Sequence, residues 1–224
     1  MTLALCMIVK NEEEVLPRCL ESVRGVFDEI IIADTGSTDK TVQIAEIYGA
    51  RVAHYPWRHD FAAARNFAFS LAAADYIMWL DADDVLQQED RQKLLGLKKA
   101  LDGSVDAYFL RYDAAFDEGG NVTMYFYRER IVRREAGFLW EGAVHETIAV
   151  RGRTQRTEIA VTHRKGLHKE RGRNLKIFAR QFAAGTKPDA RQKYYFAREL
   201  LDSGLYDTCL LYTSPSPRDP KTSR

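Results

Sequence analysis

One short stretch restricts the fold more than any other part of the sequence. Five apolar residues at 76–80 end abruptly in three acids, Asp81, Asp83 and Asp84. An uninterrupted apolar run of this length is typical of a strand buried on both faces, as in a parallel sheet. Ligands of open α/β sheets bind beyond the carboxyl ends of such strands. The stretch therefore predicts a buried strand that delivers carboxylates to a binding crevice.

The spacing of the acids predicts a cation between them. Side chains alternate along a strand, so Asp81 and Asp83 are expected on one face and Ala82 on the other. Two carboxylates so close repel each other unless a cation lies between them, and oxygen ligands suit Mg²⁺ or Mn²⁺. Such ions usually accompany a substrate phosphate. The alternative interpretation is a solvated acidic turn in which Asp84 caps the next helix.

The first 55 residues alternate between apolar runs and helical patterns. Predicted strands lie at 3–9, 29–33 and 51–55, and apolar spacing predicts helices across 15–23 and 42–48. The order strand, helix, strand, helix, strand is typical of a parallel sheet with crossover helices, which is an α/β fold. Turn chemistry supports this order, because residues 36–39 permit a tight turn and offer oxygens to cap the second helix.

The alanine-rich stretch 59–69 predicts a helix just before the acid-tipped strand, with Asp60 as its N-cap. Arg65 lies within this helix. Its planar guanidinium suits paired hydrogen bonds to a phosphate. From spacing alone, a surface ion pair with a nearby carboxylate explains the residue as well.

Downstream of the acids, the sequence predicts a long hairpin. Residues 106–112 and 122–127 alternate imperfectly, and the polar stretch 117–121 between them is typical of a turn. The aromatic side chains of this hairpin suit either an acceptor-binding surface or a hydrophobic core. The apolar run 159–161 predicts one more strand, which His163 follows.

Composition excludes several classes. A chain of 224 residues with 46% hydrophobic residues predicts one domain of ordinary size, with or without a fragment of another. The net charge of +1 argues against a general polyanion binder, and the apolar runs are too short to span a bilayer. No basic segment precedes the first apolar run, so no signal peptide is expected. The cysteines, Cys6, Cys19 and Cys209, lack metal-ligand spacing, which favours a cytoplasmic protein.

Four motifs occur in one order: MIVKNEE at 7–13, IADTGSTD at 32–39, DF to RN at 60–66, and DAD at 81–83. Together they resemble family 2 glycosyltransferases, which bind nucleotide sugars in the GT-A fold. The resemblance covers about residues 1–165, and within the family the chain resembles the bacterial branch with C-terminal tetratricopeptide (TPR) helices. It implies a hexosyltransferase-like enzyme that uses a nucleotide-sugar donor.

The resemblance also implies roles for individual residues. It assigns the nucleotide base to Asp34, places Arg65 beside the nucleotide, and makes Asp83 the direct metal ligand. Asp81 would act as a further metal ligand or through ribose or water. The residues expected at the nucleotide are Lys10, Asn11, Glu12, Asp34, Arg65 and Asp81.

The segment 137–146 combines aromatic residues, glycines, an imidazole and acids, and it resembles the acceptor side of the family branch. An inverting transferase needs a general base for the acceptor hydroxyl. Glu146 is the first candidate for this base and Asp84 the second. His145 is expected to orient Glu146 or complete the metal shell, with His163 as an alternative ligand. A structural, hydrogen-bonded role for either histidine stays open.

The expected function is therefore inverting, Mg²⁺- or Mn²⁺-dependent transfer of a sugar, with a UDP-sugar as donor, to a saccharide, lipid-linked or peptide acceptor. No nucleic-acid partner is expected. A sugar nucleotidyltransferase of related fold is a second interpretation, but it needs a glycine-rich loop after the first strand, and residues 9–14 contain no glycine. A non-catalytic repeat scaffold is the third, and it predicts no dependence on metal.

The C-terminal part is expected to be helical at first. The basic stretch 165–173 suits a diphosphate contact or a solvated helix start, and residues 175–182 predict an amphipathic helix. Residues 194–206 resemble the first helix and turn of a TPR unit, so 166–208 is expected to start a TPR-like array. From 209 onward, the prolines at 215, 217 and 220 oppose a second helix. This tail resembles a translated sequencing adapter, and 209–224 is expected to be non-native.

Overall fold

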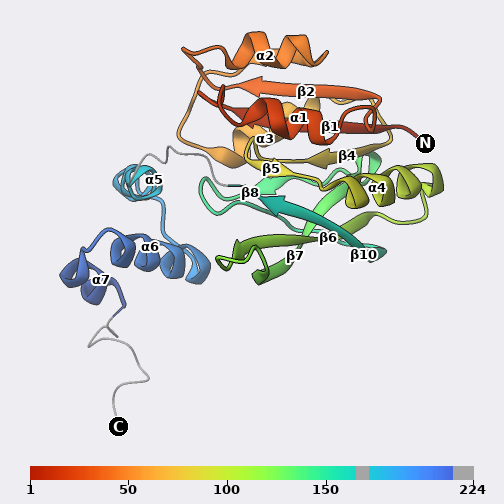
Figure 1. The fold of residues 1–224 in the computed structure, drawn as a ribbon. Coiled ribbons are helices and arrows are strands. Elements are labelled where there is room, and N and C mark those ends of the chain that lie inside the picture. The colour runs from red at the N-terminus through yellow and green to blue at the C-terminus, as the bar shows by residue number, and fades with distance from the viewer. Residues whose placement is uncertain (165–171, 214–224) are drawn as a thin grey trace. The chain divides into compact units, whose positions relative to one another are not determined.

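The computed structural model describes residues 1–164 and 172–213 (Figure 1). The chain forms two compact units. The first contains Met1–Gly142 and the stretch that starts at Glu146 and includes strand β10 (Thr154–His163). The second contains Ala143–His145 and helices α5 (Arg173–Ala183), α6 (Ala190–Asp202) and α7 (Tyr206–Thr213).

The first unit is built on an eight-stranded sheet in the order β3-β2-β1-β4-β7-β6-β10-β5. The strands besides β10 are β1 (Leu3–Val9), β2 (Glu29–Asp34), β3 (Arg51–His54), β4 (Tyr76–Trp79), β5 (Asp84–Val85), β6 (Ala107–Phe116) and β7 (Val122–Arg133). Strands β1 to β4 are parallel to one another, and β7 joins β4 antiparallel. The α/β, mostly parallel GT-A arrangement that the sequence predicts is confirmed. A separate small sheet pairs β8 (Trp140–Glu141) with β9 (Thr147–Ile148).

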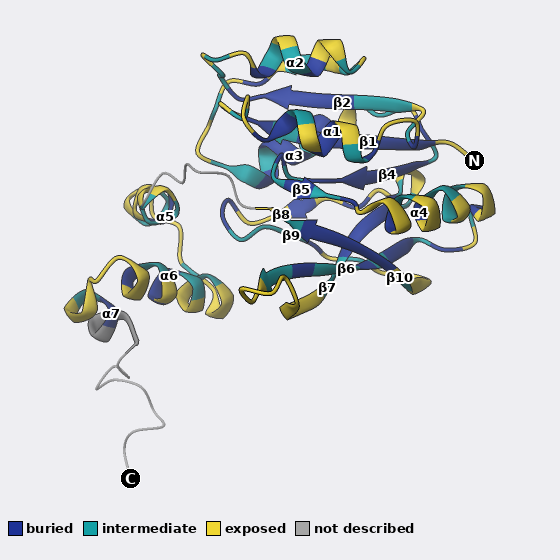
Figure 2. Ribbon diagram, in the orientation of Figure 1, coloured by how far each residue is buried: buried dark blue, intermediate teal, exposed yellow. Residues whose placement is uncertain are grey.

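Helices cover both faces of the sheet, and this explains the uninterrupted apolar strands. They are α1 (Leu16–Ser22), α2 (Thr41–Ile47), α3 (Phe61–Ser70) and α4 (Gln88–Ala100), with a short 3₁₀ helix at Arg134–Ala136. One core cluster joins alternate residues of β1 to α1, α2 and α4, and the other joins the opposite face to α3. The central strands are accordingly buried along most of their length (Figure 2).

Local signals agree with most of the predicted elements. Asp60 caps α3 as expected, because its Oδ1 accepts the Ala63 N–H at 2.8 Å. The hairpin forms from β6 and β7, which pair antiparallel around the turn at 117–121. The cap of α2 differs from the prediction: Lys40 occupies the N-cap position without a side-chain bond, while Asp39 Oδ1 accepts the Thr41 N–H at 2.9 Å.

Two expectations about the acidic loop are wrong. Strand β4 ends at Trp79, so strand alternation does not continue to Asp83. Asp84 does not cap a helix, because it lies in β5 and pairs with His163 of β10, whereas α4 begins at Gln88. The reason is a local bond: the Asp84 carboxylate accepts the Asp81 N–H at 3.0 Å and so closes a tight turn.

The helical unit begins as predicted, with α5 over the amphipathic stretch and α6 opened by a capping box of Asp189 and Gln192. The expectation that prolines prevent a following helix is wrong up to Thr213. Helix α7 forms because these prolines come after its last residue. The boundary expected at 209 thus falls inside α7. Most of the basic stretch, 165–171, and the tail 214–224 lie outside the described residues.

Across the described residues, the model contains no helix with the length and apolar character needed to cross a bilayer.

Gly152 provides a test of the first unit's packing. Its φ is +84°, and a Cβ there would lie 2.2 Å from Asp106 Oδ2, which accepts the Arg153 N–H. Gly152→Ala should lower the free energy of unfolding by about 2–4 kcal/mol, from left-handed strain plus loss of the charge-assisted bond. Gly120→Ala is the control, since its φ is +80° with open space around the new Cβ, and about 1 kcal/mol is expected. Urea unfolding measures both. Equal losses would mean that the contact with Asp106 costs nothing.

Candidate active site

Several of the predicted site residues lie where the parallel strands β1, β2 and β4 end. Strands β1, β2 and β4 run in the same direction, so their carboxyl ends meet at one edge of the sheet (Figure 1). The loop after β1 begins at Lys10, β2 ends at Asp34, and the acidic loop follows β4. This is the edge at which α/β proteins bind ligands.

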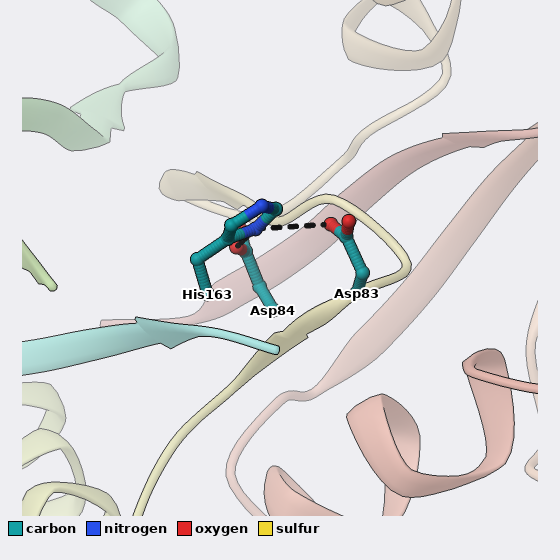
Figure 3. A group of neighbouring side chains, drawn as sticks. All are labelled: Asp83, Asp84 and His163. Atoms are coloured by element: carbon teal, nitrogen blue, oxygen red, sulfur yellow. Dashed lines mark ion pairs between the residues drawn. The ribbon is translucent and has the colours of Figure 1, made fainter. Parts of the chain in front are cut away.

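Asp83, Asp84 and His163 form a group with the geometry of a metal site (Figure 3). One ligand atom from each lies within 4.8 Å of the others, and His163 Nδ1 is 3.5 Å from Asp83 Oδ1 and 3.9 Å from Asp84 Oδ1. The pairing of β5 with β10 creates the group, because it sets His163 opposite Asp84. Asp84 Oδ1 and His163 Nδ1 are buried and have no hydrogen-bond partner among the described residues. Two carboxylates and an imidazole with orphaned atoms fit a divalent cation.

Asp84 is the most deeply buried member of this group, with no exposed surface. Burial raises the pKa of its carboxyl, and repulsion by Asp81 and Asp83 raises it further, against the opposing charge of Arg130. Arg130 Nη1 donates to Asp84 Oδ2 at 2.8 Å. A bound cation would offset the same repulsion from the other side of the carboxylate.

Asp81 lies beside this group but is engaged elsewhere. Its Oδ1 accepts from Arg65 Nη2 at 2.7 Å, and Asp81 is not a member of the metal-capable group found in the described chain. Desolvation raises the pKa of the Asp81 carboxyl. The positive charges of Arg65 and Arg130 have the larger effect and lower that pKa to about 2. Asp81 is therefore an ionised partner of Arg65.

Arg65 is buried rather than on the surface, with 7% of its area exposed. Its Nε donates to Glu146 Oε1 at 2.7 Å while Nη2 binds Asp81, so one guanidinium joins two carboxylates. The rings of Trp79 and Trp140 lie 4.9 Å and 4.8 Å from its Cζ. The surface ion pair considered from spacing is wrong about exposure, although the carboxylate partners are present.

The loops after β1 and β2 are bonded to each other. Asn11 Oδ1 accepts the Thr38 N–H at 2.8 Å, and the Asn11 N–H donates to Ser37 Oγ at 3.0 Å. Asp34 accepts from the N–H of Ser37 at 3.1 Å. Lys10 is exposed and Glu12 half-buried within the same loop. Asn11 and Asp34 are thus joined through the loop after β2 in one hydrogen-bonded network.

The two candidates of the 145–146 segment have different surroundings. Glu146 belongs to the sheet unit, where its side chain is 13% exposed and is paired with Arg65. His145 belongs to the helical unit, where its ring stacks on Tyr195 at 4.1 Å and its Nε2 lies 2.9 Å from Glu199 Oε1. Among the described residues, the histidine of the metal-capable group is His163.

Sequence reasoning missed Arg130 and the tryptophans around the arginines. Arg130 is 1% exposed, and its Cζ lies 3.7 Å from the Trp79 ring centroid. One signal was available, since Arg130 precedes two apolar residues that are buried in the same strand. A cation within a buried strand indicates an internal anion, because an unpaired charge there is costly.

Replacing Arg65 tests the joined carboxylates. Arg65→Met leaves Asp81 and Glu146 without their cation, so the free energy of unfolding should fall by about 3 kcal/mol, near the lower end for broken buried pairs because Asp81 keeps some exposure. Arg51→Met, at an exposed arginine of β3, is the control and should cost under about 1 kcal/mol. Denaturant titration gives both values. Similar losses for the two variants would show that the pairs of Arg65 with Asp81 and Glu146 contribute no more to the free energy of unfolding than an exposed arginine does.

Two curated proteins are similar to parts of this chain in sequence. A TPR repeat-containing protein of Synechococcus elongatus is 53% identical over 83 residues, which is 37% of this chain and 21% of that protein. The SPbeta prophage-derived glycosyltransferase SunS of Bacillus subtilis is 30% identical over 148 residues, 65% of this chain and 34% of the relative. The chain therefore spans about a third or less of the length of these curated relatives.

A solved structure shares the fold. Glucosyl-3-phosphoglycerate synthase of Mycobacterium tuberculosis, in complex with Mn²⁺, UDP and glucosyl-3-phosphoglycerate, superposes with a TM-score of 0.52 at 17% identity, covering 84% of this chain and 81% of the synthase. The sequence profile described as glycosyl transferase family 2 matches residues 4–170, most of the chain. The chain belongs to glycosyl transferase family 2.

Proposed function

We propose that this domain transfers a sugar, with inversion, from a UDP-sugar to an acceptor, and that it uses Mn²⁺ or Mg²⁺. The observation that carries the proposal is the convergence of Asp83, Asp84 and His163 at the carboxyl edge of the sheet, with two buried atoms lacking partners among the described residues. Family membership supports glycosyl transfer. The M. tuberculosis synthase, crystallised with Mn²⁺ and UDP, supports the choice of donor and ion.

In this proposal, the bonded loops after β1 and β2 hold the nucleotide. Asp34 accepts from the base N–H, and Lys10, Asn11 and Glu12 line the same surface. Asp81 keeps Oδ2 for a ribose hydroxyl, since Arg65 occupies Oδ1. Asp83, Asp84 and His163 would hold the cation. When bound, the cation supplies positive charge that stabilises the leaving diphosphate.

The proposed general base is Glu146. Arg65 binds Oε1 and leaves Oε2 to take the proton of the acceptor hydroxyl as that oxygen attacks the anomeric carbon opposite the leaving diphosphate. Asp84 suits this role less, because it has no exposed surface and its Oδ2 is bonded to Arg130. The acceptor class stays as expected from the sequence: a saccharide, a lipid-linked group or a peptide.

The donor site is tested by calorimetric titration of UDP into the full chain, with Mn²⁺ and again with EDTA. Binding should require Mn²⁺, and Asp83→Ala should weaken it at least tenfold because the variant loses one metal-binding carboxylate. Asp117→Ala removes an exposed carboxylate from the hairpin turn and should bind like the wild type. Equal heats with Mn²⁺, with EDTA and in Asp83→Ala would contradict the proposed site.

The base is tested by Glu146→Gln, which keeps an oxygen for Arg65 but removes the proton acceptor. The turnover number, measured as UDP release from UDP-sugars, should fall by about 10²–10⁴-fold while UDP affinity changes little. Asp84→Asn should instead weaken Mn²⁺-dependent UDP binding. If Glu146→Gln kept full turnover and Asp84→Asn lost turnover with unchanged UDP affinity, the two roles would have to be exchanged.

A further inference from the structure

Arg130 is a buried cation held on several sides by fixed groups. Its Cζ lies 3.7 Å from the Trp79 ring centroid and 4.6 Å from that of Tyr112, so its guanidinium lies against two aromatic rings. Nη1 lies 3.3 Å from the Trp79 carbonyl oxygen and 2.8 Å from Asp84 Oδ2 and donates to both. With 1% of its area exposed, Arg130 lies too deep to meet a substrate directly.

These contacts determine which way the Asp84 carboxylate faces. Its Oδ2 accepts from Arg130 and from the Asp81 N–H at 3.0 Å, so that oxygen is fixed on two sides. Its Oδ1 is left without a hydrogen-bond partner among the described residues, 3.9 Å from His163 Nδ1. The two oxygens of Asp84 therefore have different surroundings: Oδ2 is bonded to Arg130 and Asp81, and Oδ1 faces the metal-capable group.

The packing around Arg130 extends to the histidine of that group. Tyr112 contacts Arg130 on one side, and its ring centroid lies 5.8 Å from that of His163. The Tyr112 ring thus packs against both Arg130 and the His163 imidazole, which lie near opposite oxygens of the Asp84 carboxylate. Groups that bond metal ligands from behind orient them and commonly change metal affinity 10- to 100-fold when replaced.

We propose that Arg130 is a positioning residue for the acidic group: it holds Asp84 so that Oδ1 faces a divalent cation beside Asp83 and His163. The inference rests on the proposed function, because it needs the cation there. A purely structural Arg130 would only compensate the buried Asp84 charge. Either role predicts a loss of stability when Arg130 is replaced. Only the positioning role predicts that metal affinity depends on the planar shape of the guanidinium and not on its charge alone.

Arg130→Lys separates shape from charge. Lysine keeps the positive charge but has no planar fork to pack against the rings while donating to Asp84 and the Trp79 carbonyl. Arg133→Lys is the matched control, since Arg133 lies in the same strand and also pairs with an aspartate, Asp106, near the opposite end of β4. Mn²⁺ alone is the probe, and free Mn²⁺ is measured by electron paramagnetic resonance.

Arg130→Lys should bind Mn²⁺ about tenfold more weakly than the wild type, and Arg133→Lys should stay within twofold. Circular dichroism in EDTA checks that both variants fold. Wild-type affinity in Arg130→Lys, or an equal loss in Arg133→Lys, would overturn the inference and leave the proposed function standing. A wild-type chain without Mn²⁺ binding would overturn both.

Tyr112→Leu covers the case in which Arg130→Lys does not fold. This variant leaves the charge of Arg130 in place and removes one of the rings against it. Mn²⁺ affinity should fall below that of the wild type, since the arginine and His163 lose a ring that packs against both. Unchanged affinity in a folded Tyr112→Leu would overturn the positioning role.

Discussion

The site depends on arginines buried beside clustered carboxylates. Asp81, Asp83 and Asp84 follow one another within a short loop, and alone they would repel. Arg65 and Arg130 lie 4.9 Å and 3.7 Å from the Trp79 ring and bind Asp81 and Asp84. Both cations thus pack against the same indole, with Arg65 bonded to Asp81 and Arg130 bonded to Asp84. Asp83 instead lies beside the imidazole of the metal-capable group, with its Oδ1 at 3.5 Å from His163 Nδ1.

The parallel half of the fold could be predicted from the sequence because its signals are local. Apolar runs, helical spacing and the Asp60 cap each lie within a few residues of the element they specify. The turn after β4 and the partners of Asp84 could not be predicted in this way. The turn there is closed by Asp84 itself and by Arg130, 46 residues further on, and no pattern within the loop records that bond.

The candidate site shows the same division. Motif resemblance predicted roles for Asp83, Arg65 and Glu146, but not that Arg65 joins Asp81 to a carboxylate 81 residues away. The sequence offered His145 first as a histidine for the metal shell and His163 as an alternative, and the pairing of β10 with β5 sets His163 opposite Asp84. Arg130 belongs to no motif, since its importance comes from aromatic and acidic groups that the sheet brings together. Contacts of this kind are properties of the pairing between strands.

The two-residue strand β5 pairs with β10, which is the last strand of the sheet to be synthesised. The acids, the arginine behind Asp84 and His163 come from successive parts of the chain, and the last of them ends β10. On a ribosome, strands β1 to β4 are available for pairing before this final strand emerges. Pairing β10 with β5 also brings His163 to the acids, so a chain interrupted before β10 would contain the acids and Arg130 without the imidazole of the metal-capable group.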